Sequence, residues 1–157
     1  AATAIAALER LVAAAYRPGD GLAHGPGAAA AVRGLLADQW AAAAALIAAH
    51  ELTGDAVWAM LAEELARGSL RRHRDAARGG FFDRPPWNPA EDPPGLLRER
   101  IKPVRANAEA ARVLRRLARL SGDGVLEDHA RATLAWAGTL RGRTLEEAAA
   151  CALAVID

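Results

Sequence analysis

Two short turns constrain the fold of this chain more than any other feature of its sequence. Thr53-Gly54-Asp55 and Ser121-Gly122-Asp123 each lie between two segments in which apolar residues recur at helical spacing. The glycine can adopt the left-handed conformation that ends a helix, and the aspartate can cap the helix that follows. Because a connection this short makes the flanking helices antiparallel neighbours, we expect a helical hairpin around each turn.

Both turns belong to an internal repeat. Residues 45–55 align with residues 113–123 without a gap, and the same register places Gln39 opposite Asn107. Two amide side chains therefore occupy equivalent places near the start of two equivalent helices. Such self-similarity indicates that one supersecondary unit is used more than once.

Helical spacing of apolar residues extends through the chain, and no stretch alternates apolar and polar residues as a half-buried strand requires. The run from Trp40 to Ala49 is apolar all round, which predicts a helix buried on every side. Thr144 and Glu147 form a capping box at the start of the last helical segment. We predict one all-α domain over residues 1–157, with three antiparallel hairpins built from helices at about 2–16, 32–52, 56–72, 107–120, 124–140 and 144–156.

A segment at about residues 79–103 interrupts the helical pattern. It opens with Gly79-Gly80-Phe81-Phe82-Asp83 and continues through a proline-rich stretch. Proline does not fit the interior of a helix, so we predict a non-helical loop here. A long ordered loop in a small domain usually caps or serves a site.

Charge and cysteine content narrow the possible partners. The net charge of +1 gives no overall reason to expect nucleic acid or an anionic membrane as a partner. Cys151 is the only cysteine, which excludes an intrachain disulfide and the CxxC motifs. The longest apolar run is too short to span a bilayer, and no signal peptide opens the chain, so we expect a cytoplasmic protein. The chain begins at Ala1 rather than at Met, which is consistent with a fragment or a processed product.

Four motifs, in this order and spacing, resemble bacterial thioredoxin-domain-containing proteins whose C-terminal half is similar to an N-acylglucosamine 2-epimerase toroid. The motifs lie at residues 16–21, 34–55, 79–83 and 107–123. The resemblance implies an (α/α) toroid of the six-hairpin glycosidase-like kind, whose inner helices line a pocket that commonly receives sugars. This chain supplies about half of its six hairpins and lacks the thioredoxin-like domain. Because an isolated half would expose apolar helix faces, we expect either a missing N-terminal half or a homo-oligomer.

The same resemblance leaves enzymatic activity open. Sugar epimerases of this kind carry a proton-transferring histidine just before an asparagine at the start of an inner helix, whereas here Ala106 precedes Asn107. Arg105 cannot act as the base, because its guanidinium stays protonated. A second catalytic histidine of those enzymes lies on an earlier hairpin, which we expect to be missing from this chain. Epimerase activity is therefore not expected from this chain alone.

The candidate ligand-binding residues are those that the implied toroid places near its pocket. Asp38 and Gln39 suit sugar hydroxyls, and a carboxylate can also serve as an acid or base, although Asp38 equally suits the first turn of its helix through the dipole. Asn107 either points into the pocket or caps its helix. Arg105 either lines a site for an acidic sugar or is solvated.

Phe82 and His24 complete the candidate set. The Phe82 ring either stacks on a sugar or fastens the loop to the domain, and His24, in a glycine-rich connection, is a candidate rim residue. The four histidines show no metal-ligand spacing, so no zinc site and no cofactor are expected. The sequence predicts a toroid domain that binds a sugar or sugar-like ligand. The alternative is a non-catalytic helical module for interaction or assembly.

Overall fold

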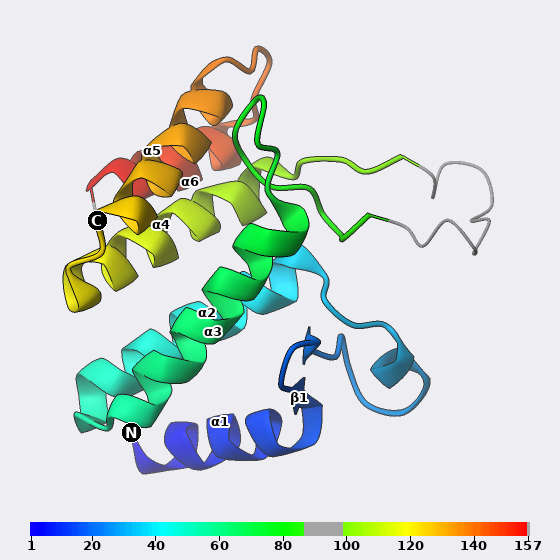
Figure 1. Cartoon of the computed structure of the whole chain (residues 1–157), viewed down its shortest axis with the longest axis vertical. Coiled ribbons are helices and arrows are strands. Elements are labelled where there is room, and N and C mark those ends of the chain that lie inside the picture. Colours follow the sequence, from blue (N-terminus) through cyan, green and yellow to red (C-terminus); the bar gives the residue numbers. More distant parts are fainter. Residues whose placement is uncertain (87–98, 157) are drawn as a thin grey trace.

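The protein is described here by a computed structural model that defines residues 1–86 and 99–156. Within these ranges the chain is mostly helical, which confirms the all-α prediction (Figure 1). In chain order the elements are α1 (Ala2–Ala15), β1 (Tyr16–Arg17), β2 (Gly21–Leu22), the 3-10 helix η1 (Gly27–Ala31), α2 (Leu36–Thr53), α3 (Ala56–His73), α4 (Val104–Ser121), α5 (Gly124–Gly138) and α6 (Leu145–Ile156). The described parts of the loop predicted at 79–103 are non-helical up to Pro103, and residues 87–98 lie outside the described residues.

The two predicted turns join α2 to α3 and α4 to α5 as antiparallel hairpins. Gly54 and Gly122 have φ angles of 74° and 73°, the left-handed conformation expected of a glycine that ends a helix. The carboxylates of Asp55 and Asp123 each accept a hydrogen bond, at 2.9 Å, from the backbone N–H two residues further on. Both turns therefore form as their sequences predict.

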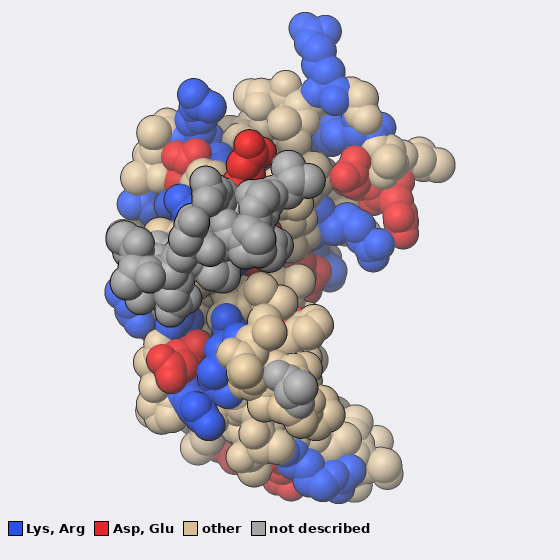
Figure 2. Space-filling view, turned by 90° about the vertical axis from the view of Figure 1, so that its right-hand side faces the viewer, with Lys and Arg blue, Asp and Glu red and all other residues tan. Residues whose placement is uncertain are grey.

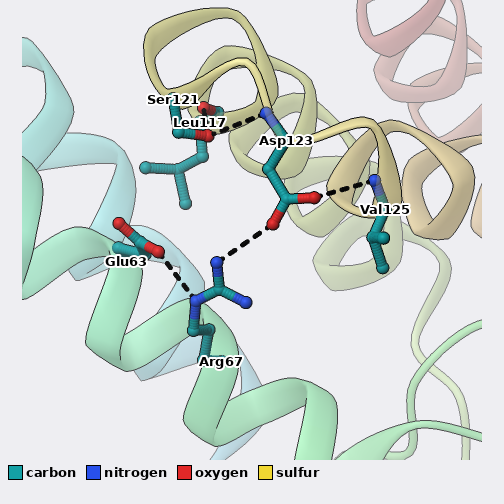
Figure 3. Close-up of polar contacts among 6 residues, drawn as sticks. All are labelled: Glu63, Arg67, Leu117, Ser121, Asp123 and Val125. Carbon is teal, nitrogen blue, oxygen red and sulfur yellow. Dashed lines mark hydrogen bonds and ion pairs between the residues drawn. The ribbon is translucent and has the colours of Figure 1, made fainter.

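An ion pair fastens the second turn to the first hairpin. The Arg67 guanidinium on α3 donates to Glu63 of its own helix at 2.7 Å and to Asp123 at 3.0 Å (Figure 3). Asp123 thus caps α5 and contacts α3 with the same carboxylate. The Val125 N–H and the Arg67 guanidinium both lower the pKa of this carboxyl group.

The helices form two layers. α2, α4 and α6 lie side by side, with α4 in the middle, while α3 packs against α2 and α5 against α4 (Figure 1). The core lies where these elements meet, and the Trp40 and Phe81 rings there pack in a T-shaped arrangement with 5.3 Å between their centroids. α1 lies at one end of the molecule and contacts α2 and β1.

Several boundaries differ from the sequence-based ones. The first helix ends at Ala15, because Pro18 and the glycines that follow turn the chain into an antiparallel pair of two-residue strands. α2 begins at Leu36 rather than at residue 32, since Gly34 lies before it with a φ of 71°. α4 begins at Val104, three residues earlier than expected, directly after Pro103.

The molecule is curved, and Figure 2 shows it hollowed on one side. Two hollows lie on helix α2 and share Ala41. The first, which we call the α1–α2 hollow, is enclosed by α1, β2, residues 23–30 and α2, and it has a volume of about 850 Å³. The second, the α4–α6 hollow, lies among α2, α4 and α6 and measures about 370 Å³. No helix in the described part of the chain is long and apolar enough to cross a bilayer.

Candidate functional site

Gln39 lies in the first turn of α2 and bonds to both main-chain polar groups of one residue in the preceding loop. Its Oε1 accepts from the Leu22 N–H at 2.9 Å, and its Nε2 donates to the Leu22 carbonyl at 3.3 Å. Nε2 also lies 3.3 Å from the carbonyl of Leu35, one turn earlier. The side chain has no exposed surface. We call this arrangement an amide clasp.

Asn107 forms a second amide clasp at the equivalent place on α4. Its Oδ1 accepts from the Phe81 N–H at 2.6 Å, and its Nδ2 donates to the Phe81 carbonyl at 3.0 Å and to the Pro103 carbonyl at 2.9 Å. This side chain is also fully buried. The predicted equivalence of Gln39 and Asn107 is therefore present in the structure. Asn107 does not cap α4, because the helix begins before it.

Each clasped residue follows a glycine that the clasp requires. Gly21 and Gly80 have φ angles of 77° and 72°, which side-chain-bearing residues rarely adopt. A Cβ on Gly21 would lie 2.3 Å from the Gln39 Oε1, and one on Gly80 would lie 3.0 Å from the Asn107 Oδ1. The sequence carries a signal for each clasp, a glycine before an apolar residue and an amide in the next helix, but the contact itself forms only in the folded chain.

Two of the predicted site residues meet at the rim of the α1–α2 hollow. His24 Nδ1 lies 2.9 Å from Asp38 Oδ2, and both residues line this hollow. The His24 side chain is 54% exposed and the Asp38 side chain 25% exposed, so solvent and ligands can reach the pair. An ionised carboxylate only accepts hydrogen bonds, so His24 donates to it from Nδ1. In the neutral imidazole this tautomer leaves Nε2 as an acceptor.

The His24–Asp38 pair does not belong to the internal repeat. In the register that aligns Gln39 with Asn107, the position of Asp38 is taken by Ala106. The capped turns and the amide clasps occur in both units, whereas this pair occurs in the first alone. The hairpin architecture therefore forms at the second unit without such a pair. Asp38 does lie in the first turn of α2, where the helix dipole favours a carboxylate.

Phe82 lies in the loop that the second clasp fastens. The Arg100 guanidinium carbon stands 4.1 Å from the centre of its ring and the Lys102 ammonium nitrogen 5.1 Å. The Lys102 ammonium group also contacts the Asp75 carboxylate at 2.7 Å and the Gly79 carbonyl at 2.7 Å. Its hydrogen bond to Asp75 helps to lower the pKa of that carboxyl group to about 2. Among the described lining residues of the two hollows, Phe82 does not occur. Its ring packs within the loop.

Arg105 lines the α4–α6 hollow and not the larger one. Its guanidinium lies 3.2 Å from Glu146, and both side chains are exposed. The structure thus separates the six candidate residues into three groups. His24 and Asp38 stand together, Gln39 and Asn107 are bonded to the main chain, and Phe82 and Arg105 lie elsewhere.

His73, at the end of α3, is a buried titratable group outside the set of predicted site residues. Its Nδ1 donates to the Phe82 carbonyl at 3.1 Å, and the side chain has no exposed surface. Burial lowers the pKa of this imidazole to about 4. The neutral His73 imidazole therefore holds the loop through this hydrogen bond.

Within residues 1–86 and 99–156, no group of three His, Cys, Asp or Glu side chains is arranged to hold a metal ion. The chain matches no protein-family model and no curated protein.

The clasps predict a measurable loss of stability. Replacing Asn107 by alanine leaves the buried N–H and carbonyl of Phe81 without their partner, and each unpaired group costs about 1–3 kcal/mol. We expect Asn107→Ala to lower the free energy of unfolding in urea by roughly 3 kcal/mol. Gln39→Ala should lower the free energy of unfolding by less than Asn107→Ala does, because the hydrogen bonds from the Gln39 Nε2 are longer. Glu146→Gln, at an exposed ion pair, is the control, and equal stability of N107A and this control would contradict the role of the clasp.

The low pKa of His73 predicts a pH dependence of folding. In the unfolded chain a histidine takes up its proton near pH 6.5, whereas the folded chain resists protonation down to about pH 4. Stability should therefore fall as the pH drops through this window, by roughly 2 kcal/mol between pH 7 and 4.5. His73→Asn keeps a donor to Phe82 but cannot titrate. Urea unfolding at both pH values should show a smaller decrease in the free energy of unfolding for this variant than for the wild-type chain. An identical decrease would refute the assignment of the pH dependence to His73.

Proposed function

We propose that this chain is a helical-hairpin domain that binds a sugar or sugar-like ligand in the α1–α2 hollow. The observation that carries the proposal is the pairing of His24 with Asp38 at the rim of this hollow. Its volume of about 850 Å³ falls within the range of small-molecule sites, about 300–1,000 Å³. The layer of α2, α4 and α6, with α3 and α5 packed against one side of it, supports a partial (α/α) toroid as the scaffold.

The polar pair offers two hydrogen-bond acceptors, a carboxylate oxygen and an imidazole nitrogen, to the hydroxyl groups of a ligand. The Asp38 carboxylate accepts hydrogen bonds from ligand hydroxyls, and the neutral His24 imidazole accepts another through Nε2. Asp38 also fixes the orientation of the imidazole, so the two acceptors keep a constant spacing. The proposal assigns binding and no reaction, because the described lining of the hollow adds no second carboxylate or nucleophile to this pair.

Removal of the Asp38 charge tests the proposal. A panel of monosaccharides, disaccharides and uronic acids should include a compound that raises the melting temperature of the wild-type chain. Asp38→Asn should reduce the affinity for that compound at least tenfold, because a charged acceptor is lost. Asp128→Asn, at an exposed ion pair on α5, should leave it unchanged. No response to the whole panel, or equal binding by D38N, would refute sugar binding at this site.

A second candidate function is assembly with another copy of the chain. α6 exposes large apolar side chains beyond its contact with α4: Leu145 is 88%, Val155 61% and Ile156 79% exposed. A second copy that covers this face would remove apolar surface from water and continue the layer of α2, α4 and α6. This observation favours a homo-oligomer through α6.

Sedimentation velocity distinguishes the assembly function. At micromolar concentration the wild-type chain should contain a dimer, and Val155→Glu should shift it to the monomer by placing a charge in the contact. Glu146→Gln, on the same helix, should keep the dimer. A wild-type chain that sediments as a monomer over the whole concentration range would remove this candidate.

A further inference from the structure

We propose that the ligand of the α1–α2 hollow is an amphiphile, with a hydroxylated head at His24–Asp38 and an apolar tail along the wall between α1 and α2. This inference rests on the proposed function, because it assigns the head group to the same polar pair. It adds the chemical class of the remainder of the ligand.

The hollow is polar at one end and apolar along its wall. His24 and Asp38 are the charged or titratable residues among its described lining. The rest of the wall is made by small and aliphatic residues, among them Leu8, Leu11, Leu22, Ala41 and Ala45. No aromatic ring occurs among the described lining residues to stack on a bare sugar. A ligand that matches this surface has one hydrogen-bonding end and an aliphatic body.

Helix α1 is incompletely packed on the side that faces the hollow. No residue of α1 is fully buried, and Leu11 is 47% exposed although it lines the hollow. Ile5, Leu8 and Val12 are partly buried against the core, so the apolar stripe of α1 faces inward without being covered. An aliphatic tail would cover this stripe and the facing side of α2 at once.

The internal repeat shows why there is space beside α2. Ala45 aligns with Val113, and Val113 is fully buried in the second unit. At the equivalent place in the first unit, the alanine is exposed to the hollow. Ala41 and Ala42 also face it with the smallest side chains that a helix favours. The equivalent position is therefore covered in the second unit and open to the hollow in the first.

A homologous series of alkyl glucosides tests the tail directly. Methyl, butyl and hexyl β-glucoside share one head group, and titration calorimetry with each compound below its micelle-forming concentration measures single molecules rather than a lipid surface. Burial of one methylene contributes up to about fourfold in affinity. In this half-open hollow we expect affinity to rise by about two- to fourfold per methylene. An affinity that does not change with chain length would overturn the inference, while Asp38-dependent binding of methyl glucoside would leave the proposed function standing.

Matched variants locate the tail. Ala45→Leu fills the wall of the hollow and should weaken hexyl glucoside about tenfold while methyl glucoside binds as before. Ala48→Leu, at an exposed position of the same helix outside the hollow, is the control and should change neither. Equal loss in both variants, or no loss in A45L, would contradict the assigned position. If hexanol binds as tightly as hexyl glucoside and D38N binds both equally well, the head-group assignment fails and the proposed function fails with it.

Discussion

The structure depends on two buried amide groups that each bond to both main-chain polar groups of a single loop residue. Loops carry N–H and carbonyl groups that must be paired if they are to lie against a core without water. Gln39 and Asn107 provide this pairing for Leu22 and Phe81. Phe81 can then reach the ring of Trp40, and its loop can approach the start of α2. The clasps thus help to fix the connections that precede α2 and α4 on the helical layer.

Features that occur in both units of the repeat build the architecture, whereas a feature that occurs in one unit marks the candidate site. Capped turns and amide clasps occur in both units, each with the glycine that its backbone conformation requires. The His24–Asp38 pair occurs in one unit, at the rim of the larger hollow. The same unit has Ala45 where the other has Val113. The polar pair and the open volume therefore occur together, which is the arrangement that a binding site needs.

Several sequence predictions were local and succeeded for that reason. A glycine–aspartate turn ends one helix and caps the next through bonds that span a few residues, so its outcome does not depend on the rest of the fold. The capping box of Thr144 and Glu147 forms in the same way, with both reciprocal hydrogen bonds present. α4 begins three residues before its predicted start, and Asn107 does not cap it, because the Asn107 side chain bonds to a loop 26 residues earlier in the chain.

The sequence by itself determined the helices, their two hairpin turns and the equivalence of Gln39 with Asn107. The tertiary structure decided what those amides bind. An amide offers the same donor and acceptor to a sugar hydroxyl as to a peptide group, so its partner is selected by the loop that approaches it. It also decided that His24 meets Asp38. The two residues are 14 apart in the sequence, and the course of the loop between them is set by Gly34 and by contacts with residues far along the chain. Short-range chemistry is encoded residue by residue, whereas the surface left open between α1 and α2 exists only once the helices have packed.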